Sequence, residues 1–147
     1  MQVQLGKGKA GKRTKEWVRI EPSDVWNLDH TLALIIWPAL VEYKKQAQGV
    51  VMVDDKDLPE HLHYIFPTDP ADYTPKQEQM LISRYDYVLT EIIWAMKEIA
   101  NEYQNKPKIR SRSKKYKAQD IKDALEYEKK ISNGCELFGK YFRGFWD

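Results

Sequence analysis

Two segments of this 147-residue chain repeat apolar side chains in alternating steps of three and four residues. This spacing puts the side chains on one face of an α-helix, which must then be covered by another element. In the first segment the repeat consists of Leu81, Tyr85, Val88, Ile92, Met96 or Ala95, Ile99 and Tyr103. In the second it consists of Ile121, Ala124, Glu128, Ile131, Cys135, Phe138, Phe142 and Phe145. The pattern predicts two long helices that pack through these stripes.

Capping residues mark the start of the first of these helices. Thr74 and Gln77 can form a capping box, and Pro75 suits the first helical position. The helix is expected to extend to about Gln104.

The second helix is expected over residues 118–142. Gly134 and Gly139 interrupt its helix propensity, at a cost of about 1 kcal/mol each relative to alanine. An alternative interpretation is that these glycines allow another helix to approach closely.

A third helix is predicted earlier in the chain, from Ser23 or Asp29 to about Gln48. Its middle, LALIIWPALV, is apolar on every face, so we expect this helix at the centre of the domain. Pro38 removes one backbone hydrogen bond and predicts a kink or a break into two helices. The predicted fold is therefore all-α, a single domain over residues 1–147 built as an irregular bundle of three long helices.

One ordered loop and two basic extensions are expected outside the helices. Residues 50–73 contain several prolines and the cluster Asp54-Asp55-Lys56-Asp57, and predict a long ordered loop with a helical turn at residues 59–64. Residues 1–16, rich in glycine and lysine, predict a flexible basic arm, and residues 105–117 a basic linker. Residues 17–20 are expected to be extended, with Trp17 packed on the body and no obvious strand partner.

Positive charge is concentrated in two segments. Residues 1–20 and 105–118 hold 13 of the 24 basic residues but only one of the 22 acidic ones. The other 113 residues, with 11 basic and 21 acidic side chains, carry a net charge of −10. This asymmetry indicates either a polyanionic partner or extensions that fold back on an acidic surface. Solvated charged loops that aid solubility are the third interpretation.

Several classes of protein are disfavoured. The longest apolar run, Leu32 to Val41, has ten residues, about half of what a membrane-spanning helix needs. A basic N-terminus without an apolar stretch does not resemble a signal peptide. The single cysteine, Cys135, leaves no internal disulfide and fits a reducing cytosol. The glycine-rich stretch from Gly6 to Lys12 superficially resembles a phosphate loop but lacks the preceding strand and the following helix that such a loop needs. No Walker loop, nucleophile elbow or zinc motif is present, so no cofactor is predicted.

Charged and aromatic residues alternate along a second face of the residue 75–104 helix. Steps of three and four residues beside the apolar stripe connect Arg84, Tyr87, Glu91, Trp94 and Glu98. Rings that stack on a flat ligand and charges that orient it would form a binding pocket of this composition. The same pattern is typical of an ordinary boundary between core and solvent, and both interpretations stay open.

Glu128 occupies a position that the repeat assigns to apolar side chains. A buried carboxylate is costly unless it is paired or ligated. It is therefore predicted to contact a ligand or metal or, as we favour, either to bridge to a lysine or arginine of another helix or to lie at an end of the stripe that is open to water. In the basic linker, Arg110, Arg112, Lys114 and Lys115 are candidates for binding phosphate groups.

Four stretches resemble a family of small proteins of unassigned function in tailed bacteriophages. They are DVWNLDHTLALIIWPALVEYKK (24–45), VDDKDLPEHL (53–62), YDYVLTEIIWAM (85–96) and NGCELFGKYFRGFWD (133–147). The resemblance implies a phage product that acts in the host bacterial cytoplasm, but implies no activity. By matching positions it draws attention to Asp24, Trp26, Asp29, Asp54, Asp55, Glu91 and Trp146. Tyr85 and Thr90 depart from the family pattern, which has a tryptophan and an acid there.

Three functions are compatible with these features. The first is a non-enzymatic binder that blocks host defence by sequestering a nucleotide-like ligand or binding a host component. Its ligand-binding residues would be Arg84, Tyr87, Glu91, Trp94, Glu128, Arg110, Arg112, Lys114 and Lys115, and it is expected to be a homo-oligomer without a membrane partner. The second is an accessory protein of phage replication or packaging that binds nucleic acid through residues 7–19 and 106–117. The third is a metal-dependent nucleotide hydrolase that uses Asp24, Asp29, Glu91 and Glu128.

Overall fold

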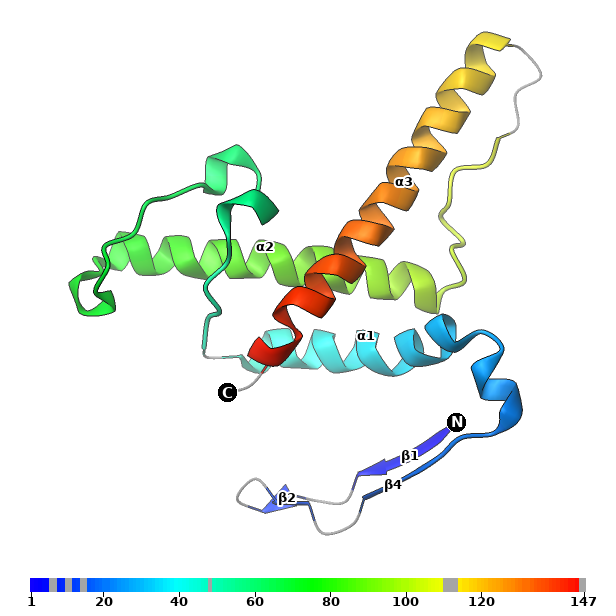
Figure 1. Cartoon of the computed structure of the whole chain (residues 1–147), viewed down its shortest axis with the longest axis horizontal. Helices are drawn as coiled ribbons and strands as arrows, with labels where there is room; N and C mark the ends of the chain where they lie inside the picture. Colours follow the sequence, from blue (N-terminus) through cyan, green and yellow to red (C-terminus); the bar gives the residue numbers. More distant parts are fainter. Residues whose placement is uncertain (6–7, 10–11, 14–15, 48, 110–113, 146–147) are drawn as a thin grey trace.

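Three long helices make up about half of the chain. The computed structural model describes residues 1–5, 8–9, 12–13, 16–47, 49–109 and 114–145. Helix α1 comprises Leu28–Gln46, α2 comprises Pro75–Ala100, and α3 comprises Lys114–Tyr141 (Figure 1). The predicted all-α arrangement of three helices is confirmed. Short 3-10 turns flank them: η1 Pro22–Val25, η2 Asp55–Asp57, η3 Glu60–Leu62, η4 Pro70–Asp72 and η5 Phe142–Gly144. Turn η3 lies where the sequence predicts one.

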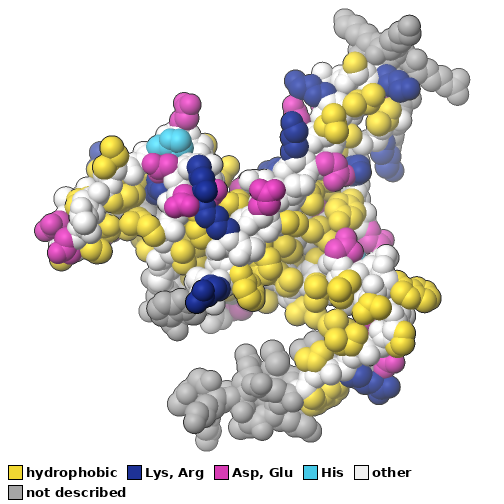
Figure 2. Space-filling model, viewed as in Figure 1, with side chains coloured by type: hydrophobic (Ala, Val, Ile, Leu, Met, Phe, Trp, Pro, Cys, Tyr) yellow, Lys and Arg dark blue, Asp and Glu magenta, His cyan; other side chains and the backbone are white. Residues whose placement is uncertain are grey.

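Helix α2 is the central element of the bundle. It packs against α1 on one side and α3 on the other, and α3 crosses the pair diagonally (Figure 1). Helix α1 contributes only Ala33 and Leu40 to the buried residues, so the expectation that it lies at the centre is wrong. Many of its apolar side chains are instead exposed at the edge of the bundle, where Figure 2 shows hydrophobic side chains gathered over α1. It continues through Pro38 without the break that the sequence allowed.

The predicted stripe of α2 forms the core. Leu81, Tyr85, Val88, Ile92, Ala95, Met96 and Ile99 are all buried. The predicted capping box also forms, because Thr74 Oγ1 accepts from the Gln77 N–H and the Gln77 side chain accepts from the Thr74 N–H. The helix ends at Ala100, earlier than expected, because Glu102 and Tyr103 adopt left-handed φ angles of 51° and 56° that turn the chain away.

The buried face of α3 is rotated relative to the predicted stripe. Its buried apolar side chains are Tyr127, Ile131, Leu137 and Tyr141. Phe142, expected in the stripe, is 59% exposed and lies in η5. Before Tyr127 the described side chains of α3 are exposed or half-buried, and this half of the helix projects beyond the body (Figure 1).

An antiparallel ribbon precedes the helices. Strand β1, Gln2–Leu5, pairs with β4, Glu16–Arg19, and β2, Gly8–Lys9, pairs with β3, Lys12–Arg13. The expectation that residues 17–20 have no strand partner is therefore wrong. The partner was hard to foresee because β1 is a four-residue strand with one apolar pair, Val3 opposite Val18. Trp17 is 38% exposed.

None of the helices in the described ranges contains a stretch long and apolar enough to cross a membrane.

Candidate functional site

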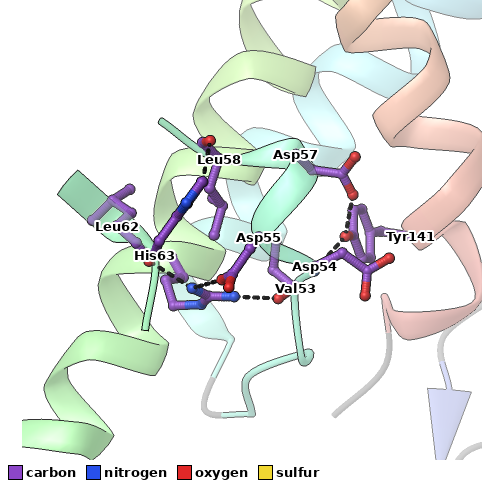
Figure 3. Close-up of polar contacts among 9 residues, drawn as sticks. Val53, Asp54, Asp55, Asp57, Leu58, Leu62, His63 and Tyr141 are labelled. Carbon is purple, nitrogen blue, oxygen red and sulfur yellow. Dashed lines mark hydrogen bonds and ion pairs between the residues drawn. The ribbon is translucent and has the colours of Figure 1, made fainter. Parts of the chain in front are cut away.

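Arg84, from the predicted ligand face, anchors the long loop to α2. Its side chain is 4% exposed, and its Nη1 atom lies 2.6 Å from Oδ1 of Asp55 and 2.5 Å from the carbonyl oxygen of Leu62. Its Nη2 atom donates to the carbonyl of Val53 (Figure 3). A buried guanidinium needs such partners to replace water. Because these donors are engaged within the protein, Arg84 is not part of the candidate site described below.

The end of α3 holds the same loop from another side. Lys140 forms ion pairs with Asp54 and Asp57. The Tyr141 hydroxyl donates to Asp57 Oδ2 at 2.6 Å and accepts from the Asp54 N–H at 3.1 Å (Figure 3). Burial alone would raise the pKa of Asp57, but the hydrogen bonds from Lys140 and Tyr141 outweigh it and hold this pKa below its usual value.

The acidic cluster of the loop therefore has a structural role. The hydrogen bond from Arg84 is the main reason why the pKa of Asp55 is lowered. Between the two anchors, Val53 and Leu58 are buried in the core. The loop at residues 53–62 and the end of α3 thus contact each other through side-chain bonds.

Trp94 lies between the two helices that flank α2. The Lys130 ammonium of α3 is 4.3 Å from the centroid of the indole ring, a cation–π contact, and also lies 3.5 Å from the Glu91 carboxylate. Tyr127 meets the same ring edge-on, with centroids 5.6 Å apart. These contacts fix the orientation of Trp94, which is only half-buried.

Glu98 contacts the same tyrosine, Tyr127, nearer the end of α2. It is 3% exposed and accepts hydrogen bonds from the Tyr127 hydroxyl at 2.7 Å and from the Asn105 amide at 2.9 Å. Burial and then the Glu98 carboxylate raise the pKa of Tyr127, so its hydroxyl stays protonated and donates. Glu128, beside Tyr127, is half-exposed and pairs with Lys106. It bridges to a lysine, as in the interpretation we favoured, but the lysine lies in the linker after α2.

A groove beside Trp94 is the candidate ligand site. We call it the Trp94 groove; it has a volume of about 530 Å³ and is lined by Val41, Lys44, Lys45, Thr90, Ile93, Trp94 and Lys97. Its floor is apolar, its rim carries three lysines, and its lining includes no acidic residue. The volume and the lining of the Trp94 groove are typical of small-molecule sites, which combine an apolar floor with a few polar groups.

The rim lysines differ in how far their charges are neutralised. Lys44 lies 2.7 Å from Asp86 and donates to Thr90 Oγ1. Lys45 pairs with the exposed carboxylate of Glu42 at 3.3 Å, an interaction of little energy at a solvated surface. Within the described part of the chain, no acidic side chain pairs with Lys97.

Among the described residues, none of the other predicted ligand residues lines this groove. Tyr87 is half-buried against the core, where burial and then Glu91 raise its pKa. Arg110 and Arg112 lie outside the described residues, and Lys114 and Lys115 begin α3, at the end of this helix that projects from the body in Figure 1.

The carboxylates predicted for a hydrolase have separate partners. Asp24 pairs with the N-terminal ammonium of Met1 at 2.5 Å, and Asp29 accepts from the Tyr103 hydroxyl at 3.1 Å. Glu91 and Glu128 are held by different lysines. Within the described ranges, no group of three or more histidine, cysteine, aspartate or glutamate side chains is placed to hold a metal ion.

Comparison of the chain with protein-family models, curated proteins and solved structures finds no match. The resemblance to a phage family therefore stays a prediction.

Sequence reasoning identified Trp94 but missed the rest of the groove. Thr90 and Lys97 lie four residues before and three after Trp94, so helical spacing could have added them to the same face. Val41, Lys44 and Lys45 come from α1, and only the packing of α1 on α2 brings them to Trp94.

Proposed function

We propose that this protein is a non-enzymatic binding protein that holds a flat anionic ligand of the nucleotide class in the Trp94 groove. The observation that carries the proposal is the combination, in one groove, of a fixed half-buried tryptophan with a rim of three lysines and no acid. A base or similar ring would lie on the apolar floor, and a phosphate would meet the rim lysines. Stacking on an aromatic ring contributes about 1–3 kcal/mol per base.

The electrostatics of the groove support an anion in particular. Lys97 brings a charge that no described carboxylate neutralises, and the partner of Lys45 is exposed to solvent. A phosphate placed there gains attraction without first displacing a buried ion pair. Lys44, already bound to Asp86 and Thr90, is better suited to shaping the rim.

The biological setting of the proposal depends on the phage resemblance. A phage product acting in the host cytoplasm could block a defence response by sequestering a nucleotide signal or by binding a host component. Sequestration requires binding without turnover, which an apolar floor and a cationic rim can provide without a catalytic group.

The test is calorimetric titration of the purified protein with a panel of nucleoside mono-, di- and triphosphates and cyclic nucleotides. We expect at least one to bind without being converted. Lys97→Glu should weaken that binding about tenfold, which corresponds to about 1.4 kcal/mol. Lys76→Glu is the matched control, because Lys76 is an exposed lysine on the same helix, near its other end.

Two results would overturn this function. One is that no member of the panel binds. The other is that Lys97→Glu and Lys76→Glu weaken binding equally, since a general effect of net charge would then explain the loss.

Nucleic-acid binding is the second candidate, and the placement of the basic segments favours it. The ribbon with Gly8–Lys9 paired to Lys12–Arg13 and the start of α3 both project from the helical body (Figure 1). The major groove of DNA admits a two-stranded ribbon. Affinity would then fall steeply with salt, and charge reversal of Lys114 and Lys115 would weaken binding to all sequences. Affinity that does not change with salt would exclude this candidate.

A further inference from the structure

The outer face of α1 carries an apolar stripe that no described element of the chain covers. Leu28, Leu32, Ile35 and Ala39 are all exposed, with exposed fractions of 42%, 39% and 40% for the three large side chains. Their steps of four, three and four residues align them along one face of the helix. We call these four residues the α1 stripe.

We infer that the α1 stripe is the interface through which two copies of this chain form an antiparallel dimer. Steps of three and four residues are the spacing with which helices pack knobs into holes. A twofold axis between Leu32 and Ile35 would place these two residues of one copy against Ile35 and Leu32 of the other. The same axis places Leu28 opposite Ala39, so a large side chain meets a small one at each end.

The charge pattern of α1 favours a second copy over a charged partner. None of the eleven residues from Thr31 to Val41 is charged. Two copies can therefore approach along this stretch without opposing like charges, and a twofold interface is self-complementary by construction. A strongly charged partner would find no complementary charge here.

A groove next to the stripe extends the same surface. It lies between α1 and the C-terminal end of the chain, has a volume of about 290 Å³, and is lined by apolar or aromatic side chains that include Ile35, Ala39 and Phe142. Trp26, which is 83% exposed, lies just before α1. In the antiparallel pair the start of α1 of one copy lies beside the end of α1 of the other, where this groove opens. We therefore assign the groove to Trp26 of the second copy.

The proposed dimer is independent of the proposed ligand site. Ile35 and Ala39 belong to the α1 stripe, whereas Val41 and Lys45 point to a different side of α1 and line the Trp94 groove. Lys97→Glu should therefore leave the dimer intact, and loss of the dimer would not by itself exclude ligand binding.

The first experiment is sedimentation equilibrium over a wide range of protein concentration. The wild-type protein should have twice the mass of one chain, and Ile35→Lys should have the mass of one. Leu34→Lys is the matched control, because Leu34 is 50% exposed but lies about 130° around the helix from the stripe. It should remain dimeric, and the helix content of both variants should match that of the wild type.

A cross-linking experiment tests the same interface without an added charge. In a Cys135→Ser background, Ile35→Cys treated with a short bis-maleimide should give a covalent dimer, and Leu34→Cys should not. A wild-type protein that is monomeric at all concentrations would overturn the inference. So would a Leu34→Lys variant that dissociates as readily as Ile35→Lys, or equal cross-linking at residues 34 and 35.

Discussion

At Gly134 of α3, the helix α2 lies too close to leave room for a side chain. A Cβ atom added there would lie 2.3 Å from Cβ of Ala95 and 2.9 Å from the carbonyl oxygen of Glu91. Carbon atoms in contact are separated by about 3.5–4.0 Å, so Gly134→Ala must move the two helices apart by more than 1 Å or distort them. Overpacking of this kind costs about 1–3 kcal/mol, while the gain in helix propensity is at most about 1 kcal/mol.

We therefore expect Gly134→Ala to destabilise the protein by about 1–2 kcal/mol and to lower its Tm by about 3–6 °C. Gly139→Ala is the matched control in the same helix, because an added Cβ meets nothing within 4 Å there. It should raise the stability by up to about 1 kcal/mol through helix propensity alone. The assay is urea unfolding followed by circular dichroism, with thermal unfolding alongside. A Gly134→Ala variant as stable as Gly139→Ala would refute the close approach of the two helices.

Two further predictions concern the anchored loop. Arg84→Ala should destabilise the protein by about 3 kcal/mol, because it removes a buried guanidinium and leaves three acceptors without their donor. Backbone hydrogen exchange should accelerate across residues 53–62 in this variant. In the control Arg143→Ala, which changes an exposed arginine, exchange should be unchanged. Equal exchange rates in the two variants would contradict the role of Arg84 in holding the loop. The lowered pKa of Asp57 stabilises the folded state above the unfolded-state value of about 3.9, and this stability is lost as the pH falls through the folded-state pKa. The Tm of the wild type should therefore fall more steeply below about pH 4 than that of Asp57→Asn, and parallel curves would exclude the contribution of Asp57.

The helices could be predicted because their signals are local. The capping box at Thr74 and the stripe from Leu81 to Ile99 involve residues within one or two turns of each other, and both form as expected. The place of each helix in the bundle is set by partners far along the chain. The apolar middle of α1 predicted a central helix, but burial in the bundle requires neighbours on all sides, and α1 packs mainly on α2.

The candidate site was predicted only in part for the same reason. Helical spacing identified the face with Arg84 and Trp94, but these residues lie more than two turns apart and meet different elements. Arg84 meets the loop, Trp94 meets α1 and α3, and neither partner could be inferred from the spacing within α2. The residues that complete the Trp94 groove come from α1, about 50 residues earlier in the chain.

The position of α1 in the bundle and the make-up of the Trp94 groove both depend on the faces that α1 presents. A helix that is apolar on every face has two faces to cover, and α2 covers only one of them. On its inner flank α1 supplies Val41 and two lysines to the Trp94 groove, and on its outer face it presents the α1 stripe. The apolar side chains that predicted a central helix would then be buried in the proposed dimer and not within a single chain. In the proposed dimer, α1 of each copy lies between its own α2 and α1 of the other copy, at the centre of the pair.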